Sequence, residues 1–132
     1  MENSGWYKID KFLDEVTARD YDVVIIPGGA WNPDTLRLNP AAVSFIIEMY
    51  NTGKLTTAIC HGPVVLINTG LLRGRTVTGN WNIHLDLKNA GAKIIEQPVV
   101  VDGNLITGRS PYDLPQYLET IVEVVIKPNS LQ

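Results

Sequence analysis

Cysteine is scarce in this chain of 132 residues, which contains only Cys60. One cysteine excludes an internal disulfide framework and is typical of proteins kept in a reducing compartment, so we expect a cytoplasmic protein. Histidine is almost as rare, with two residues. Because the cysteine and the histidines show no metal-ligand spacing, we expect neither a metal nor another cofactor.

Charged residues are also few, at 19% of the chain, and their balance gives a net charge of −3. Lysines and arginines are scattered, so the basic footprint of a nucleic-acid-binding protein is missing. No apolar run is long enough to cross a bilayer, and the opening MENSGWYKIDKF lacks the apolar core of a signal peptide. We therefore expect no nucleic-acid partner and no membrane association.

What the chain does contain is 45% hydrophobic residues in alternating patterns that predict one α/β domain over residues 1–132. The expected strands are 21–29, 55–60, 75–79 and 93–108, the last folded into a hairpin at Asp102-Gly103, and the expected helices are 9–20, 39–53, 63–68, 82–90 and 114–125. The strand at 21–29 is expected to be buried on both faces. Asp113 and Gln116 have the spacing of a capping box for the last helix, which we expect to end at Lys127-Pro128.

Cys60 lies at the corner where a predicted strand turns into a helix. A sharp corner crowds the backbone, and the residues two before and two after it, Ala58 and Gly62, are small. This pattern is the thiol counterpart of the serine nucleophile elbow. Backbone amides at the start of the helix favour thiolate over thiol, and with the amides of the Pro-Gly-Gly turn at 27–29 they predict an oxyanion hole. A lone cysteine is more commonly a buried structural residue, but the strand–corner–helix context favours a nucleophile.

His61 follows the cysteine directly, and the residues alone leave two roles open for it. With a carboxylate to orient it, the imidazole is a candidate general base. As a surface residue, it contributes only its backbone amide.

The segments YDVVIIPGGAWNPDTLR, AICHGPVVL, NAGAKI and VVVDGNLITGRSPYDLPQYLETIV resemble the PfpI family of stress proteins and intracellular peptidases, part of the superfamily that includes the parkinsonism-associated deglycase. The resemblance implies a flavodoxin-like three-layer α/β sandwich with a mainly parallel sheet, and Cys60 as nucleophile with His61 beside it. In PfpI-type members an acidic residue from a neighbouring subunit completes the site. Asp34 stands at that position, with a turn residue paired to Arg37 as the alternative.

The resemblance also implies roles for residues around the corner. The amides of Gly29 and His61 are expected to hold the oxyanion. Trp31, Trp81 and Arg109 are candidates for a pocket near the cysteine. Their structural alternatives are packing in a core or interface for the two tryptophans and a solvated charge for the arginine.

Family members normally carry a strand–helix–strand unit ahead of YDVVIIPGG, with a glutamate that hydrogen-bonds the thiol. None of the glutamates here, Glu2 included, ends a comparable strand, so we expect a domain truncated at its N-terminus and of low activity. The uncovered strand edges are expected to be buried by self-association into a dimer or higher oligomer.

The leading functional hypothesis is a cysteine-dependent stress-response hydrolase, either a peptidase or a deglycase or glyoxalase acting on small reactive carbonyls. The alternative is a non-catalytic redox-sensing protein with an oxidisable Cys60. Glutamine amidotransfer needs a His-x-Glu pair, whereas Leu85-Asp86 follows His84. The sequence therefore argues against that third activity.

Overall fold

The computed structural model describes residues 5–127, which leaves Glu2 and Pro128 outside. Its main sheet has four strands in the order β1 (Val23–Ile26), β2 (Leu55–Ile59), β6 (Leu105–Gly108) and β5 (Val99–Asp102). The first three strands are parallel, and β5 is antiparallel to β6. A separate parallel pair joins β3 (Thr76–Val77) to β4 (Lys93–Ile94). The predicted mainly parallel sheet is thereby confirmed.

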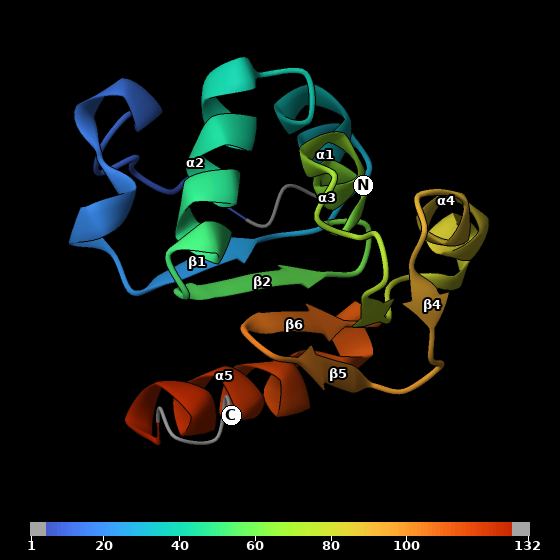
Figure 1. Ribbon diagram of the computed structural model, residues 1–132. Coiled ribbons are helices and arrows are strands. Elements are labelled where there is room, and N and C mark those ends of the chain that lie inside the picture. Colours follow the sequence, from blue (N-terminus) through green and yellow to red (C-terminus); the bar gives the residue numbers. More distant parts are fainter. Residues whose placement is uncertain (1–4, 128–132) are drawn as a thin grey trace.

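Helices cover both faces of the main sheet, so the molecule has three layers (Figure 1). The layer above β1 and β2 contains α1 (Trp31–Leu36), α2 (Pro40–Asn51) and α3 (Val64–Thr69), whereas α5 (Leu114–Ile126) lies below β6 and β5, and α4 (His84–Asn89) lies beside β4. One apolar core packs between the upper helices and the sheet. A second, smaller core joins α5 to β2 and β6. None of the helices within residues 5–127 is both long and apolar enough to span a membrane.

The helix α2 begins as its sequence predicts. Asn39 is the N-cap, and its side-chain oxygen accepts hydrogen bonds from the amides of Ala41 at 3.0 Å and Ala42 at 3.4 Å. Pro40 takes the first helical position, where its missing N–H costs nothing. Gly53 follows the end of the helix with φ of +78°, a conformation that glycine adopts without strain.

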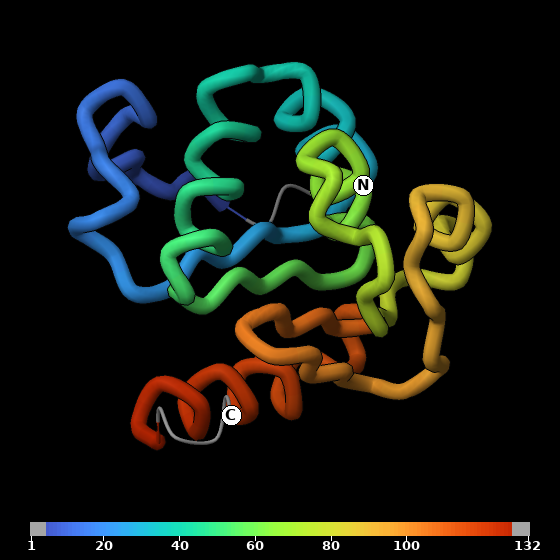
Figure 2. The backbone as a smooth tube through the Cα atoms, in the orientation of Figure 1, coloured from blue at the N-terminus to red at the C-terminus, as the bar shows by residue number. Residues whose placement is uncertain are grey.

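The predicted helix at 9–20 is wrong. This segment forms two 3₁₀ turns, η1 (Leu13–Glu15) and η2 (Ala18–Asp20), which lie against α2 (Figure 2). The Glu15 carboxylate accepts a hydrogen bond from the Phe12 amide at 2.7 Å, which makes Phe12 the residue before the η1 turn and leaves residues 9–11 ahead of it. Phe12 and Ile9 stay exposed, so a helix over this segment would gain little from burying its apolar face.

The predicted burial of β1 on both faces is also wrong. Only Ile26 of this strand is buried, and Ile25 is 49% exposed. The reason is position, since β1 is the edge of the sheet within the described residues and pairs only with β2. By contrast, every residue of β2 is buried.

Two details near the C-terminus differ from the prediction. The Asp113 carboxylate does not cap α5, because it accepts hydrogen bonds from Arg109 and Ser110 instead. The hairpin turn lies at Gly103-Asn104, one residue later than expected, with φ of +58° at Gly103.

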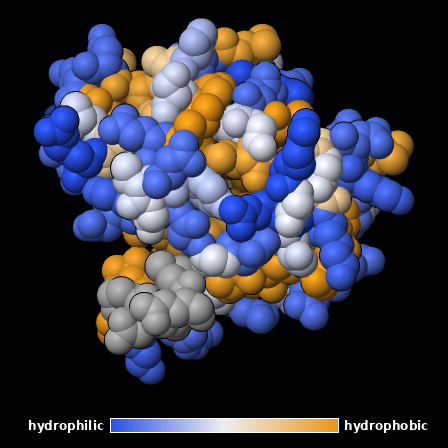
Figure 3. All heavy atoms as spheres, in the orientation of Figure 1, coloured by the Kyte–Doolittle hydropathy of each residue, from blue (hydrophilic) through white to orange (hydrophobic). Residues whose placement is uncertain are grey.

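The apolar side chains of α5 are only partly covered. Tyr117, Ile121 and Val124 are buried, whereas Leu118 and Val122 lie on the exposed side. In Figure 3, orange side chains are visible at the lower left, where α5 lies in Figure 1.

Candidate active site

Cys60 forms a strained corner at the end of β2. Its φ is +60°, and it is the one non-glycine residue within residues 5–127 whose φ is positive. This backbone conformation costs an L-residue about 1 to 2 kcal/mol. Two hydrogen bonds hold it, from the Cys60 amide to the Gly108 carbonyl at 2.9 Å and from the Asn80 amide to the Cys60 carbonyl at 2.8 Å. Such maintained strain is concentrated at functional sites.

The corner leaves no room for a Cβ at Gly28 or Gly62. A Cβ at Gly62 would lie 2.6 Å from the Ile26 carbonyl oxygen, which confirms that a small residue is required there. A Cβ at Gly28 would lie 2.8 Å from the Cys60 Cβ, so the Pro-Gly-Gly turn after β1 packs directly on the corner. Sequence reasoning missed the role of Gly28, although the parallel arrangement of the two strands brings both of their carboxyl ends to one edge.

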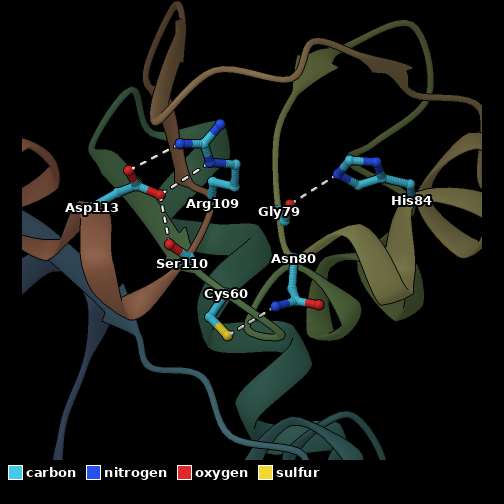
Figure 4. A network of polar contacts seen from close by, with 7 residues as sticks. All are labelled: Cys60, Gly79, Asn80, His84, Arg109, Ser110 and Asp113. Carbon is cyan, nitrogen blue, oxygen red and sulfur yellow. Dashed lines mark hydrogen bonds and ion pairs between the residues drawn. The ribbon is translucent and has the colours of Figure 1, made fainter.

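Two polar side chains approach the sulfur. Cys60 Sγ lies 3.4 Å from His61 Nδ1 and 3.9 Å from Asn80 Nδ2, and the second contact is drawn in Figure 4. The thiol is free and half-buried. The imidazole therefore lies within proton-transfer reach of the sulfur, which favours the general-base role over the amide-only role. Asn80 was missed by the sequence analysis; its position directly after the strand predicted at 75–79 was the available signal.

The backbone amides expected to hold an oxyanion are also unengaged. Neither the Gly29 amide nor the His61 amide donates a hydrogen bond to another group of residues 5–127. Gly29 has φ of +78°, and the turn that contains it packs against the corner through Gly28. The amides are thus available to an anion, whereas the Cys60 amide is committed to β6.

Asp34 does not meet His61 within the chain. It lies on α1, its side chain is 74% exposed, and its Oδ1 is 4.0 Å from Arg37 Nη1, the pairing that the alternative predicted. Arg37 also donates to Asn68 Oδ1 at 2.8 Å. The contact between Asp34 and a histidine of a neighbouring subunit stays a prediction.

The two candidate pocket tryptophans are on the surface. Trp31 is 88% exposed and lines shallow grooves beside α1 whose walls do not include Cys60. Trp81 is 59% exposed and directly follows Asn80. Neither tryptophan ring packs in the core, so that alternative is wrong, and a pocket or interface role stays a prediction.

Arg109 forms an ion pair just beyond the end of β6. Its Nε and Nη2 donate to the two carboxylate oxygens of Asp113 at 3.1 and 3.2 Å, and Ser110 Oγ donates to the same carboxylate at 2.7 Å (Figure 4). The hydrogen bond from Arg109 holds the pKa of the Asp113 carboxyl below its usual value and raises the pKa of the guanidinium. The arginine is therefore a paired charge rather than a solvated one.

Comparison with known proteins agrees with this geometry. A model described as the DJ-1/PfpI family matches residues 5–124. The chain belongs to the DJ-1/PfpI family. It is 41% identical over 117 residues to a deglycase of Thermococcus kodakarensis, covering 89% of this chain and 70% of that protein. It is 46% identical over 110 residues to protein/nucleic acid deglycase 2 of Escherichia coli, covering 83% of this chain and 63% of that protein.

Solved structures give the same DJ-1/PfpI fold. A two-domain protein of Anabaena variabilis, with DJ-1/ThiJ/PfpI-like and ferritin-like domains, superposes with a TM-score of 0.83 and 46% identity, covering 86% of this chain and 32% of that one. The flavodoxin-like sandwich is thus confirmed. The chain spans between 63% and 70% of the length of the two deglycases.

Proposed function

We propose that this chain is a cysteine-dependent hydrolase of the deglycase or glyoxalase kind, with Cys60 as nucleophile and small reactive carbonyls as substrates. The observation that carries the proposal is the strained φ of +60° at the chain's sole cysteine, with an imidazole nitrogen 3.4 Å from its sulfur. The names of the two deglycases favour carbonyl adducts over peptide bonds as the substrate.

The proposed chemistry begins with transfer of the thiol proton from Cys60 to His61. The thiolate then attacks a carbonyl carbon, which forms a carbon–sulfur bond and moves the carbonyl electron pair onto oxygen. The amides of Gly29 and His61 stabilise this oxyanion. With glyoxal, a proton shift to the neighbouring carbon gives a thioester, and water hydrolyses it to glycolate and the free thiol.

Asp34 of a neighbouring subunit is proposed to orient His61. Its support is the exposure of the Asp34 carboxylate and the apolar surface that an oligomer would cover at Ile25 and along α5. No carboxylate of residues 5–127 bonds the Cys60 sulfur. Because a carboxylate that fixes the thiol is absent from this set, we expect low activity. A free thiol of this kind stays reduced in the cytoplasm, where we place the reaction.

Glyoxal consumption by the wild type and by Cys60→Ala tests this function. We expect Cys60→Ala to reduce the rate to that of the solution without protein, and Asn82→Ala, a change of an exposed side chain, to leave it unchanged. Equal rates for wild type and Cys60→Ala would remove the enzymatic proposal. In that case, peroxide-dependent mass increases at Cys60 would support redox sensing instead.

A further inference from the structure

The side-chain amide of Asn80 has a fixed orientation. Its Oδ1 accepts a hydrogen bond from the Asn82 amide at 3.0 Å, and an N–H donor can pair only with the oxygen end of the amide. The NH₂ end therefore faces Cys60 Sγ, at 3.9 Å (Figure 4). With an exposed fraction of 9%, Asn80 is among the buried polar residues, so water competes little for this donor.

The backbone around Asn80 is held in place as well. The Asn80 amide donates to the Cys60 carbonyl at 2.8 Å, so the two residues are joined through both backbone and side chain. On the other side, His84 Nε2 lies 2.9 Å from the Gly79 carbonyl oxygen. A carbonyl only accepts, so Nε2 carries the proton and donates. These bonds form without a substrate, and the amide is therefore preorganised.

We propose that Asn80 is a positioning residue for the Cys60 sulfur, and this inference rests on the nucleophilic role of Cys60 proposed above. A hydrogen bond to sulfur stabilises the charged thiolate more than the neutral thiol. The Asn80 donor also restrains the direction of the sulfur, which matters because attack on a carbonyl requires an aligned nucleophile. The neighbouring His61 takes the proton, while Asn80 holds the anion that remains.

The effect of Asn80 on the Cys60 sulfur can be separated from the effects of the other ionisable groups nearby. His61 is on the same turn and is unchanged in every variant below. Tyr117 of α5 packs in the same apolar cluster as Cys60, and burial raises the pKa of its hydroxyl to about 12, so it stays neutral. Arg109 and Asp113 beyond β6 neutralise each other.

Alkylation by iodoacetamide, followed from about pH 5 to about pH 9, tests the proposal, because thiolate is the reactive form. With one cysteine in the chain, the rate reports on Cys60 alone. Asn80→Asp keeps the oxygen that binds the Asn82 amide and replaces the donor by a negative charge. We expect it to slow alkylation at pH 7 about tenfold, and Asn80→Ala about threefold. Asn82→Ala is the matched control, since it changes an exposed side chain two residues away and keeps the backbone donor.

Wild-type rates for both Asn80 variants at every pH would overturn the proposal, and so would equal slowing by Asn82→Ala. If the Asn80 variants do not fold, NMR of the unaltered protein decides. The chemical shifts of the Asn80 side-chain NH₂ group are expected to change over the same pH range as the alkylation rate. Chemical shifts that do not change with pH would overturn the proposal. Neither readout needs turnover, so glyoxal consumption by Cys60→Ala judges the proposed function separately.

Discussion

Strands β1 and β2 lie side by side in the sheet and end at the same edge, but their surroundings differ. β2 is buried along its whole length between β1 and β6, whereas β1 pairs on one side only within residues 5–127 and leaves Ile25 about half exposed. At the end of β2 the chain turns sharply at Cys60, and at the end of β1 the Gly28 turn packs on that corner. Cys60 therefore directly follows a fully buried strand and lies next to the end of a partly exposed one.

The largest difference expected between β1 and β2 is in how much their buried side chains stabilise the protein. Leu55→Ala in β2 removes a side chain that is 4% exposed and should destabilise the protein by about 3 kcal/mol. Ile25→Ala in β1 should cost about 1 kcal/mol, since part of this side chain is already in water. Urea unfolding at low protein concentration measures both. Equal costs would show that β1 is as buried as β2.

The corner itself should tolerate no Cβ at residue 62. Gly62→Ala places a methyl group against the Ile26 carbonyl oxygen, so we expect a loss of about 2 to 3 kcal/mol together with loss of Cys60 reactivity. Gly53→Ala is the control, because its site is open and carries only the strain of a positive φ. Thermal unfolding of the two variants separates the clash from the strain, and a Gly62→Ala protein as stable as Gly53→Ala would contradict the close contact.

The exposed side of β1 is expected to mediate self-association. A lysine at an edge strand opposes pairing with another chain, so Ile25→Lys should weaken association about tenfold. Sedimentation velocity over a dilution series measures this, with Leu85→Lys on α4, another exposed apolar residue, as the control. A wild-type protein that remains a compact monomer at all concentrations would refute the expectation.

The smallest effect concerns the Asp113 carboxylate. Its pKa is lowered by Arg109, so it stabilises the fold above the unfolded-state pKa and loses that contribution as the pH falls. Asp113→Asn should therefore lower the melting temperature by about 3 °C or less at pH 7, with the gap closing below about pH 4. Melting curves at both pH values check this. A gap that persists in acid would mean that the loss is steric.

Local signals in the sequence predicted much of this architecture. The cap at Asn39, the buried run of β2 and the small Gly62 are visible in the local sequence, and each is confirmed. The failures depend on side-chain environments that the patterns do not reveal. Ile9 and Phe12 of the 9–20 segment stay exposed, and the Asp113 carboxylate bonds Arg109, four residues earlier, in place of the α5 amides.

Some residues of the candidate site could be predicted from the local sequence and others could not. The corner at Cys60 follows from a strand-to-helix transition that the sequence displays, whereas Asn80 reaches the sulfur from twenty residues away. That contact depends on how the loop after β3 is placed against the corner, which no local pattern encodes. The role of Asp34 requires a second subunit and stays a prediction.

The proposed chemistry requires the sulfur of Cys60 to bond covalently to a carbonyl carbon. Mixing the protein with glyoxal, quenching in acid within a turnover and analysing peptides by mass spectrometry tests it most directly. We expect a mass increase of one glyoxal on the peptide that contains Cys60 and none on the same peptide of Cys60→Ala. An unmodified Cys60 peptide in a sample that consumes glyoxal would contradict it.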